Sequence, residues 1–268
     1  MNPIIVLGTG PNSAKSHVCA GLARYLARNG VRVIPFKAVT LRQSLPAEAT
    51  TTAEWWPIAR AAGVPWQRCM TPVLAKPLTL ATAELYVNDK RLPAAALISD
   101  DTVNFGSLPA ADRMTVEHAI AEALTRLQHQ ADAGLLLVEG AGSPLDAPVD
   151  LANQFVFERL IHLVPRILIT TDGWNGGPVG SLVGTHACLP DALRENVVAF
   201  VINRPRSGEV GERWASHIAR RTGVSRIGIV PNLPTLTDMR NRDENAVVNA
   251  WADALEQAFR LSDLLRLD

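Results

Sequence analysis

The sequence predicts an α/β fold of three layers, in which helices cover both sides of a mainly parallel sheet. Short apolar runs alternate along the chain with longer segments whose apolar residues recur at helical spacing. Several of these runs have no polar residue at alternate positions, which is typical of parallel strands buried on both faces. Strands that are separated by helices favour right-handed crossovers within one sheet.

The expected strands cover 4–7, 31–36, 83–87, 135–138, 166–170, 197–202 and 226–230. The expected helices cover 15–28, a stretch around 179–188, and 209–221. Apolar stripes predict two more helices: one that Thr115 caps, with Val116, Ile120, Leu124 and Leu127, and a last one with Val248, Trp251, Leu255 and Phe259. The turn at Asn88 and Asp89 predicts a hairpin. Residues 38–80 are rich in threonine, alanine and proline and favour neither element.

The composition sets broad limits on the class of protein. The chain has 268 residues, 47% of them hydrophobic, and we expect a single domain over 1–268 with no linker. Its 26 basic and 26 acidic residues balance, so charge favours neither nucleic acid nor an anionic membrane as a partner. No apolar run reaches the roughly 18 residues of a membrane helix, and the start of the chain lacks the basic residues of a signal peptide. We therefore expect a cytoplasmic protein.

The three cysteines, Cys19, Cys69 and Cys188, are scattered along the chain and have no metal-ligand spacing. We expect them to be reduced and mostly buried. The six histidines also lack the spacing of metal ligands.

A glycine-rich loop lies between the first expected strand and the first expected helix. Backbone N–H groups of such a loop, with the N-terminus of the next helix, can hold phosphates. Lys15 would reach the outer phosphates of ATP, and the Ser16 hydroxyl would bind Mg²⁺. The nucleotide-binding residues expected here are Gly8, Thr9, Gly10, Asn12, Ser13, Ala14, Lys15, Ser16 and His17.

This loop departs from the usual phosphate-binding motif in two ways. Five residues rather than four separate Gly8 from position 14, and Ala14 replaces the glycine before the lysine. The alternative is an ordinary turn, but the order of strand, glycine turn, Lys-Ser pair and amphipathic helix favours a phosphate site. Because glycine allows conformations closed to other residues, we expect Ala14 to weaken nucleotide binding.

Two charged residues follow expected strands, where ligands of parallel sheets bind. Glu139 follows a wholly apolar strand and is placed to hold Mg²⁺ directly or through water; the alternative is a capping or turn carboxylate. Lys37 ends the second expected strand and would face the γ-phosphate or an anionic substrate; the alternative is a solvated surface lysine.

The ends of the last two expected strands carry residues suited to a nucleotide base. Asn203 offers both a donor and an acceptor to the edge of adenine. Pro231 and Asn232 follow the last strand and would pack on the base. Turn chemistry is the alternative for all three residues. The glycine-rich stretch 172–177 is either a mobile loop near the substrate or a flexible turn.

These short motifs, taken in order, resemble the synthetase domain of cobyric acid synthase, in the dethiobiotin-synthetase-like group of P-loop NTPases. The resemblance spans nearly the whole chain. The matching stretches are the glycine loop, Phe36-Lys37, 72–77, 138–144, 150–153, Gly176-Gly177, 181–185, 201–204 and Val230-Pro231.

The resemblance implies an ATP- and Mg²⁺-dependent carbon–nitrogen ligase. A substrate carboxylate attacks the γ-phosphate, and ammonia or an amine captures the acyl phosphate. The matched positions imply catalytic roles for Lys15, Lys37 and Glu139, and metal binding by Ser16 and Glu139. The family usually has a second metal carboxylate after the second strand; Glu54 is our candidate, and Glu48 competes with it.

Several positions depart from the family pattern, which makes a corrinoid substrate an unsafe inference. These are Ala14, the segment Ala38-Val39-Thr40 in place of Pro-Gln-Asn, and Trp174-Asn175 in place of Asp-Arg. We expect no glutaminase domain. None of the three cysteines has the setting of a glutaminase nucleophile, so ammonia would be free or supplied by a separate glutaminase subunit. The resemblance also implies a homodimer.

Three alternatives stay open. A cyclising carboxylase related to dethiobiotin synthetase would place a serine where this chain has Leu41. A nucleotide switch of the chromosome-partitioning kind would place an extra lysine where this chain has Gly10. A pseudoenzyme that keeps the fold without turnover would be consistent with Ala14.

Overall fold

The computed structural model describes residues 2–41, 57–99, 102–131, 134–146, 149–174, 177–234 and 243–265. Glu48, Glu54, Asn175 and Gly176, which the sequence places near the site, lie outside these residues.

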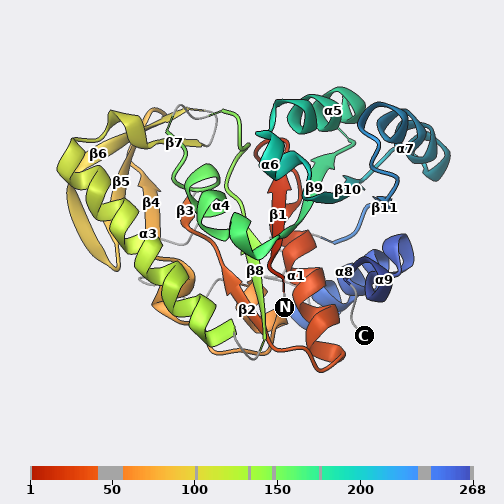
Figure 1. Cartoon of the computed structure of the whole chain (residues 1–268), viewed down its shortest axis with the longest axis horizontal. Coiled ribbons are helices and arrows are strands. Elements are labelled where there is room, and N and C mark those ends of the chain that lie inside the picture. The colour runs from red at the N-terminus through yellow and green to blue at the C-terminus, as the bar shows by residue number, and fades with distance from the viewer. Residues whose placement is uncertain are drawn as a thin grey trace.

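The centre of the molecule is a sheet of six strands (Figure 1). Its strands are β1 (Ile4–Gly8), β2 (Val33–Phe36), β8 (Leu135–Glu139), β9 (Arg166–Asp172), β10 (Val197–Asn203) and β11 (Ile227–Val230). They lie in the order β11-β10-β9-β1-β8-β2, and every neighbouring pair is parallel. Four strands lie entirely or almost entirely in the core because their residues are apolar on both faces. The predicted parallel sheet is confirmed.

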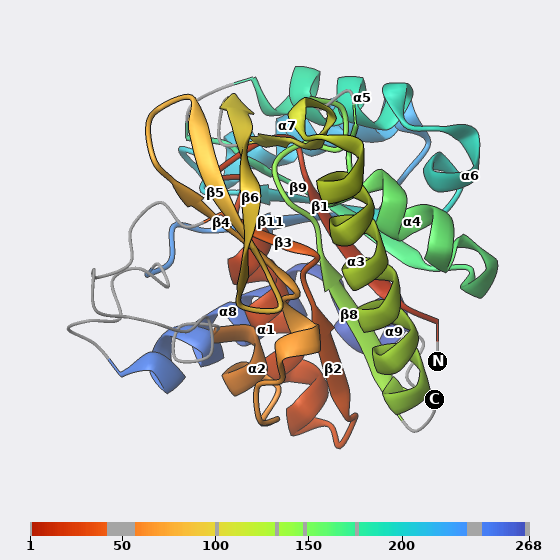
Figure 2. The same cartoon turned by 90° about the vertical axis from the view of Figure 1, so that its left-hand side faces the viewer.

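Helices cover both faces of this sheet, which confirms the three-layer α/β prediction (Figure 2). On one face, α1 (Lys15–Arg28) packs against α8 (Glu244–Phe259) and α2 (Pro57–Ala61), and α9 (Leu261–Leu265) follows α8. The other face carries α3 (Ala110–Gln130), α4 (Gln154–Leu160), α5 (Pro178–Cys188), α6 (Asp191–Arg194) and α7 (Gly208–Thr222). Helices α1 and α8 approach closely at Gly21, where a Cβ would lie 3.0 Å from the backbone carbonyl carbon of Trp251.

A second sheet of five strands forms the left-hand part of Figure 1 and was not predicted. It contains β3 (Val39–Leu41), β4 (Val73–Pro77), β5 (Thr82–Val87), β6 (Lys90–Ser99) and β7 (Thr102–Asn104), in that order. Only the β3–β4 pair is parallel. The predicted hairpin turn is confirmed, since Asn88 and Asp89 have φ angles of 48° and 64° between β5 and β6.

Three short 3₁₀ helices complete the described elements: η2 (Arg68–Met70), η3 (Phe105–Ser107) and η5 (Ile161–Leu163). Buried residues of both sheets belong to one continuous hydrophobic core. Helix α3 contacts the second sheet and also β2, so it joins the two sheets.

The predicted cap at Thr115 is wrong. Helix α3 begins at Ala110, directly after Pro109, and Thr115 lies inside it with its hydroxyl donating to the carbonyl of Ala111 at 2.9 Å. The alanines and Met114 between Pro109 and Thr115 are good helix formers, and they extend the helix toward its N-terminus. The predicted stripe from Val116 to Leu127 is buried as expected.

Two smaller predictions also need correction. The strand expected to begin at residue 31 begins at Val33, because the N–H of Val31 still bonds to the carbonyl of Leu26 at the end of α1. The cysteines are not mostly buried: Cys19 is buried, Cys69 is half-buried and Cys188 is exposed.

Candidate functional site

The loop after β1 folds tightly around its own side chains. A Cβ on Gly8 would lie 1.9 Å from Oγ of Ser13 and 2.8 Å from Nζ of Lys15, so only glycine fits there. Asn12 and Ala14 have φ angles of 56° and 68°, in the left-handed region. Ala14 therefore takes the conformation that a glycine adopts more readily.

Threonines at the end of β9 anchor this loop. The N–H of Thr9 bonds to the carbonyl of Thr170 at 3.0 Å, and the buried hydroxyl of Thr170 donates to the carbonyl of Ser13 at 2.8 Å. The hydroxyls of Thr9 and Thr171 lie 2.9 Å apart. Thr9 was predicted from the sequence, but Thr170 and Thr171 were not, although two threonines near the end of an apolar strand are a detectable signal.

Lys15 is buried within the loop. Its Nζ donates to the carbonyls of Gly10 at 2.8 Å and Gly142 at 3.0 Å, and to Oγ of Ser13 at 3.3 Å. Burial, and then the positive charge of Lys37, lower the pKa of Lys15 to about 8. This ammonium group is held by neutral oxygens, and a phosphate would give it a stronger partner.

Glu139 joins the loop to the neighbouring strand. Its Oε1 accepts hydrogen bonds from Oγ of Ser16 at 2.7 Å and from Nζ of Lys37 at 2.5 Å. Its Oε2 is buried and has no hydrogen-bond partner among the described residues. The predicted trio of Ser16, Lys37 and Glu139 is thus brought together.

The donor set around Glu139 fits a small divalent cation. A carboxylate with an unsatisfied buried oxygen and an adjacent serine hydroxyl supply the hard oxygen ligands that Mg²⁺ prefers. Within the described ranges, no group of three or more His, Cys, Asp or Glu residues is arranged to hold a metal. Mg²⁺ in proteins usually keeps several water ligands and also binds phosphate oxygens.

A polar network holds the segment that follows Glu139. Asn153 accepts from the N–H of Ala141 at 2.9 Å and donates to the Ala141 carbonyl at 2.7 Å. Asp150 in turn accepts from the N–H groups of Ala152 and Asn153 and from the Asn153 amide. Burial raises the pKa of Asp150, although these hydrogen bonds act in the opposite direction. The network fixes the path from Glu139 to Gly142, whose carbonyl receives Lys15.

The residues expected to bind adenine lie at the ends of β10 and β11. Asn203 is buried, and its Oδ1 has no hydrogen-bond partner among the described residues. The N–H of Arg204 bonds to the carbonyl of Val230, directly before the exposed Pro231 and Asn232. The three predicted residues thus belong to adjacent strand ends, and Asn203 offers an acceptor.

An ion pair braces the Asn203 region. Arg204 donates through Nε to Oδ2 of Asp172 at 3.0 Å, and also through one terminal nitrogen. The N–H of Gly173 bonds to the carbonyl of Asn203 at 2.7 Å. The neighbouring Trp174 is exposed. The sequence analysis did not foresee this pair, because its partners are 32 residues apart.

A ring contact links helix α8 to the start of α1. The ring centroids of His17, directly after Ser16, and Trp251 on α8 lie 4.8 Å apart. Nε1 of Trp251 donates to the carbonyl of Pro234, which follows Asn232 by two residues. Helix α8 therefore connects the start of α1 to the segment after β11.

Comparison with known proteins identifies the family. Residues 4–246 match the model of the CobQ/CobB/MinD/ParA nucleotide-binding domain, named CbiA. The chain belongs to this family. Relatives in the family include the cobyric acid synthase of Ruegeria sp. (strain TM1040), which is 35% identical over 238 residues. That match covers 85% of this chain and 46% of the relative.

The cobyric acid synthase of Desulforudis audaxviator (strain MP104C) is 33% identical over 255 residues, covering 91% of this chain and 47% of the relative. The resemblance to cobyric acid synthase is therefore confirmed. The chain spans about half the length of these relatives. The MinD cell division protein of Aquifex aeolicus is 13% identical with a TM-score of 0.48, covering 96% of this chain and 97% of that one. No helix in the described part of the chain is long and apolar enough to cross a membrane.

Proposed function

We propose that this CbiA-family chain is an ATP- and Mg²⁺-dependent ligase that joins a carboxylate to ammonia or an amine. The observation that carries the proposal is the convergence of Ser16, Lys37 and Glu139 from the start of α1 and the ends of β2 and β8. The name of the relatives, cobyric acid synthase, supports a ligase of this kind.

Phosphate binding is the first task of the site. The loop from Gly8 to Ser13 and the N-terminus of α1 present backbone N–H groups and a positive helix end to an anion. Lys15 exchanges its bonds to the carbonyls of Gly10 and Gly142 for bonds to the outer phosphates of ATP. This exchange strengthens ATP binding, because charge-assisted hydrogen bonds replace hydrogen bonds to neutral oxygens.

Ser16 and Glu139 would hold Mg²⁺, which neutralises charge on the β- and γ-phosphates when bound. The orphan oxygen Oε2 of Glu139 supports this role, since a cation would satisfy it. Lys37 forms an ion pair with Glu139 and therefore lies beside the proposed metal site. Its positive charge would stabilise the transferred phosphoryl group.

The proposed reaction has two steps. An oxygen of the substrate carboxylate attacks the γ-phosphorus, and the bond from that phosphorus to the bridging oxygen of ADP breaks. The nitrogen lone pair then attacks the carbonyl carbon of the acyl phosphate, and the carbon–oxygen bond to phosphate breaks. The products are the amide, ADP and phosphate, and one proton leaves the nitrogen.

The nitrogen must reach the site from outside this chain's described residues. Burial raises the pKa of the Cys19 thiol well above its usual value and also raises the pKa of the half-buried Cys69. A nucleophilic thiol needs a lowered pKa, so neither suits glutamine hydrolysis. Cys188 is exposed at the end of α5. We propose free ammonia, or ammonia from a separate glutaminase, as the donor.

The test is ADP release by the purified chain with ATP, Mg²⁺, a panel of carboxylic acids, and either ammonium or glutamine. Release that needs both an acid and ammonium supports the ligase. Release that needs bicarbonate and a diamine instead identifies a cyclising carboxylase and overturns the proposal. ATP binding without release under any of these conditions identifies a pseudoenzyme. Glutamine hydrolysis by this chain alone contradicts the proposed nitrogen source.

A further inference from the structure

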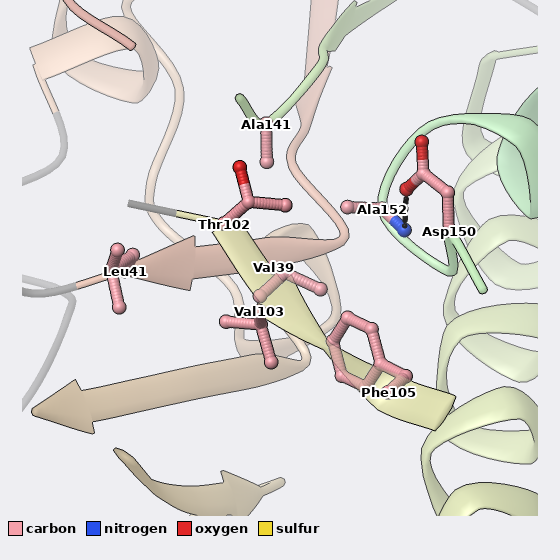
Figure 3. Close-up of a pocket in the computed structure, with 8 residues that line it drawn as sticks. All are labelled: Val39, Leu41, Thr102, Val103, Phe105, Ala141, Asp150 and Ala152. Carbon is pink, nitrogen blue, oxygen red and sulfur yellow. Dashed lines mark hydrogen bonds between the residues drawn. The ribbon is translucent and has the colours of Figure 1, made fainter. Parts of the chain in front are cut away.

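A small cavity lies between the second sheet and the segment that follows β8 (Figure 3). Its volume is about 20 Å³, somewhat more than one water molecule requires. Six of its lining residues are apolar: Val39, Leu41, Val103, Phe105, Ala141 and Ala152. Thr102 and Asp150 complete the lining. The cavity therefore admits a molecule of one or two heavy atoms.

The cavity contains one unsatisfied polar atom. Oγ1 of Thr102 is buried and has no hydrogen-bond partner among the described residues. A buried hydroxyl without a partner is costly, and such groups in proteins usually serve a bound molecule. The carboxylate of Asp150, by contrast, accepts three hydrogen bonds from Ala152 and Asn153. Thr102 is thus the group that would recognise an occupant.

The cavity also lies next to the reacting groups. Oγ1 of Thr102 lies 2.7 Å from the position that a Cβ on Gly142 would take, and the carbonyl of Gly142 accepts from Nζ of Lys15 at 3.0 Å. On the other side, Val39 follows Lys37 by two residues. Two of the segments that line the cavity, 39–41 and the one at Ala141, therefore adjoin Lys37 and the carbonyl that holds Lys15.

We propose that this cavity holds ammonia, the nitrogen nucleophile of the ligase. This inference rests on the proposed function. Its size suits a single heavy atom and excludes the substrate acid. Six of its eight lining residues are apolar, and the carboxylate of Asp150 is already occupied by three hydrogen bonds, so the wall disfavours the ammonium ion, which would lose its hydration, and admits neutral ammonia. Thr102 accepts an N–H bond from the ammonia, which leaves the nitrogen lone pair free to attack the acyl phosphate as described above.

Water has a similar size, and its presence beside an acyl phosphate would lead to hydrolysis. A cavity that binds ammonia in preference to water would therefore protect the acyl phosphate from hydrolysis and also supply the nucleophile. Binding of water only is one outcome of the following test.

The first experiment measures binding without turnover. Methyl NMR spectra are recorded while ammonium chloride is added, below and above the pKa of ammonium, with sodium chloride as the control at each pH. The probes are the methyl groups that line the cavity: Val39, Leu41, Val103, Ala141 and Ala152. We expect saturable shifts at these methyls that follow the concentration of free ammonia. Shifts that are absent or spread evenly over the protein overturn the proposal and leave water as the occupant.

Two matched variants test whether the methyl shifts arise from ammonia bound in the cavity. Thr102→Val removes the orphan hydroxyl, and should abolish the shifts without lowering the melting temperature, because no hydrogen bond is lost. Thr40→Val removes another buried hydroxyl without a described partner, on the opposite side of β3 from Val39 and Leu41. The Thr40 variant should keep the shifts. Equal shifts in wild type and Thr102→Val contradict the proposal.

The second experiment uses whichever acid supports ADP release. We expect Thr102→Val to raise the KM for ammonium about 10-fold, the loss typical of one hydrogen bond, with the KM for ATP unchanged. Thr40→Val should match the wild type. If ammonia binds in the NMR experiment while no acid supports ADP release, the ligase proposal fails and the ammonia site stands. If ADP release occurs and Thr102→Val leaves the ammonium KM unchanged, the ammonia site fails and the ligase stands.

Discussion

Nζ of Lys37 lies 2.5 Å from Oε1 of Glu139, and the register of the sheet explains why. Strands β2 and β8 are parallel neighbours in which Phe36 pairs with Val138. Lys37 and Glu139 each follow one member of that pair, so their side chains leave adjacent strand ends. Glu139 is almost fully buried and would be costly there without a partner. The lysine supplies that partner and neutralises the carboxylate.

Glu139→Gln should reduce ATP turnover at least about 10²-fold, because it removes the charge that holds the metal while keeping the shape of the side chain. The measurement is ADP release under saturating ATP and Mg²⁺. Glu158→Gln, at an exposed position on α4, is the matched control. Near-normal turnover of Glu139→Gln would show that this carboxylate is not the metal ligand.

Lys37→Met should lower the free energy of unfolding by about 3 kcal/mol, since it leaves the buried Glu139 without its ion-pair partner. The double variant Lys37→Met/Glu139→Gln should recover most of that loss, because both charges are gone. Urea denaturation of the wild type, both single variants and the double variant gives the coupling between the two residues. Strictly additive losses contradict a coupled buried pair.

ATP affinity should be highest below about pH 8 and should fall as pH rises above it. The pKa of Lys15 is about 8 in the free protein, and phosphates beside it would raise that pKa. Between the free and the bound pKa the complex holds more protons than its parts, so binding takes up protons and weakens as pH rises. Titration calorimetry near pH 9, in buffers of different ionisation enthalpy, measures the uptake. Lys15→Met should abolish it, and an unchanged uptake in that variant would point to another group.

Ala14→Gly should tighten ATP binding and raise the free energy of unfolding by about 0.5 kcal/mol. The left-handed conformation costs an L-residue about 1 kcal/mol, and the greater freedom of glycine in the unfolded chain offsets part of the gain. Ala27→Gly, at a right-handed position in α1, should instead destabilise by about 1 kcal/mol. Weaker ATP binding by Ala14→Gly would mean that the loop is adapted to alanine.

Asn203→Ala should weaken ATP binding about 10-fold, because the free acceptor Oδ1 would no longer meet the amino group of adenine. Purine riboside triphosphate lacks that amino group and tests the contact directly. The wild type should bind it about 10-fold more weakly than ATP, and the variant should bind both equally. A variant that still discriminates between them would exclude this contact.

Much of the six-stranded sheet could be predicted from sequence because its signals are local. The helix 15–28 was predicted with its observed bounds, since Lys15 begins an amphipathic stripe and Gly30 stops it. The strands were predicted within a few residues because their runs are wholly apolar. In the second sheet only the strand at 83–87 and its hairpin turn were predicted. The strands β3 and β4 were missed because residues 38–80 hold many threonines, alanines and prolines with no clear period.

In the candidate site, too, residues with local sequence signals were predicted and residues without them were not. Lys15, Ser16, Lys37 and Glu139 were predicted because each follows a recognisable strand, and the structure brings them together. The support for these residues is non-local and could not be predicted. Thr170 holds the carbonyl of Ser13, and Asp172 holds Arg204, only because β9 lies beside both β1 and β10. Sheet order is not contained in any short motif.

Between Lys37 and β8 the chain forms the five-stranded sheet, α2 beside α1, and α3. Among the described residues, those that we assign to phosphate, metal or base all lie before or after this stretch. Only the ammonia cavity and its Thr102 draw on it. A change in the second sheet should therefore alter the choice of acid or nucleophile without altering the described residues that we assign to ATP.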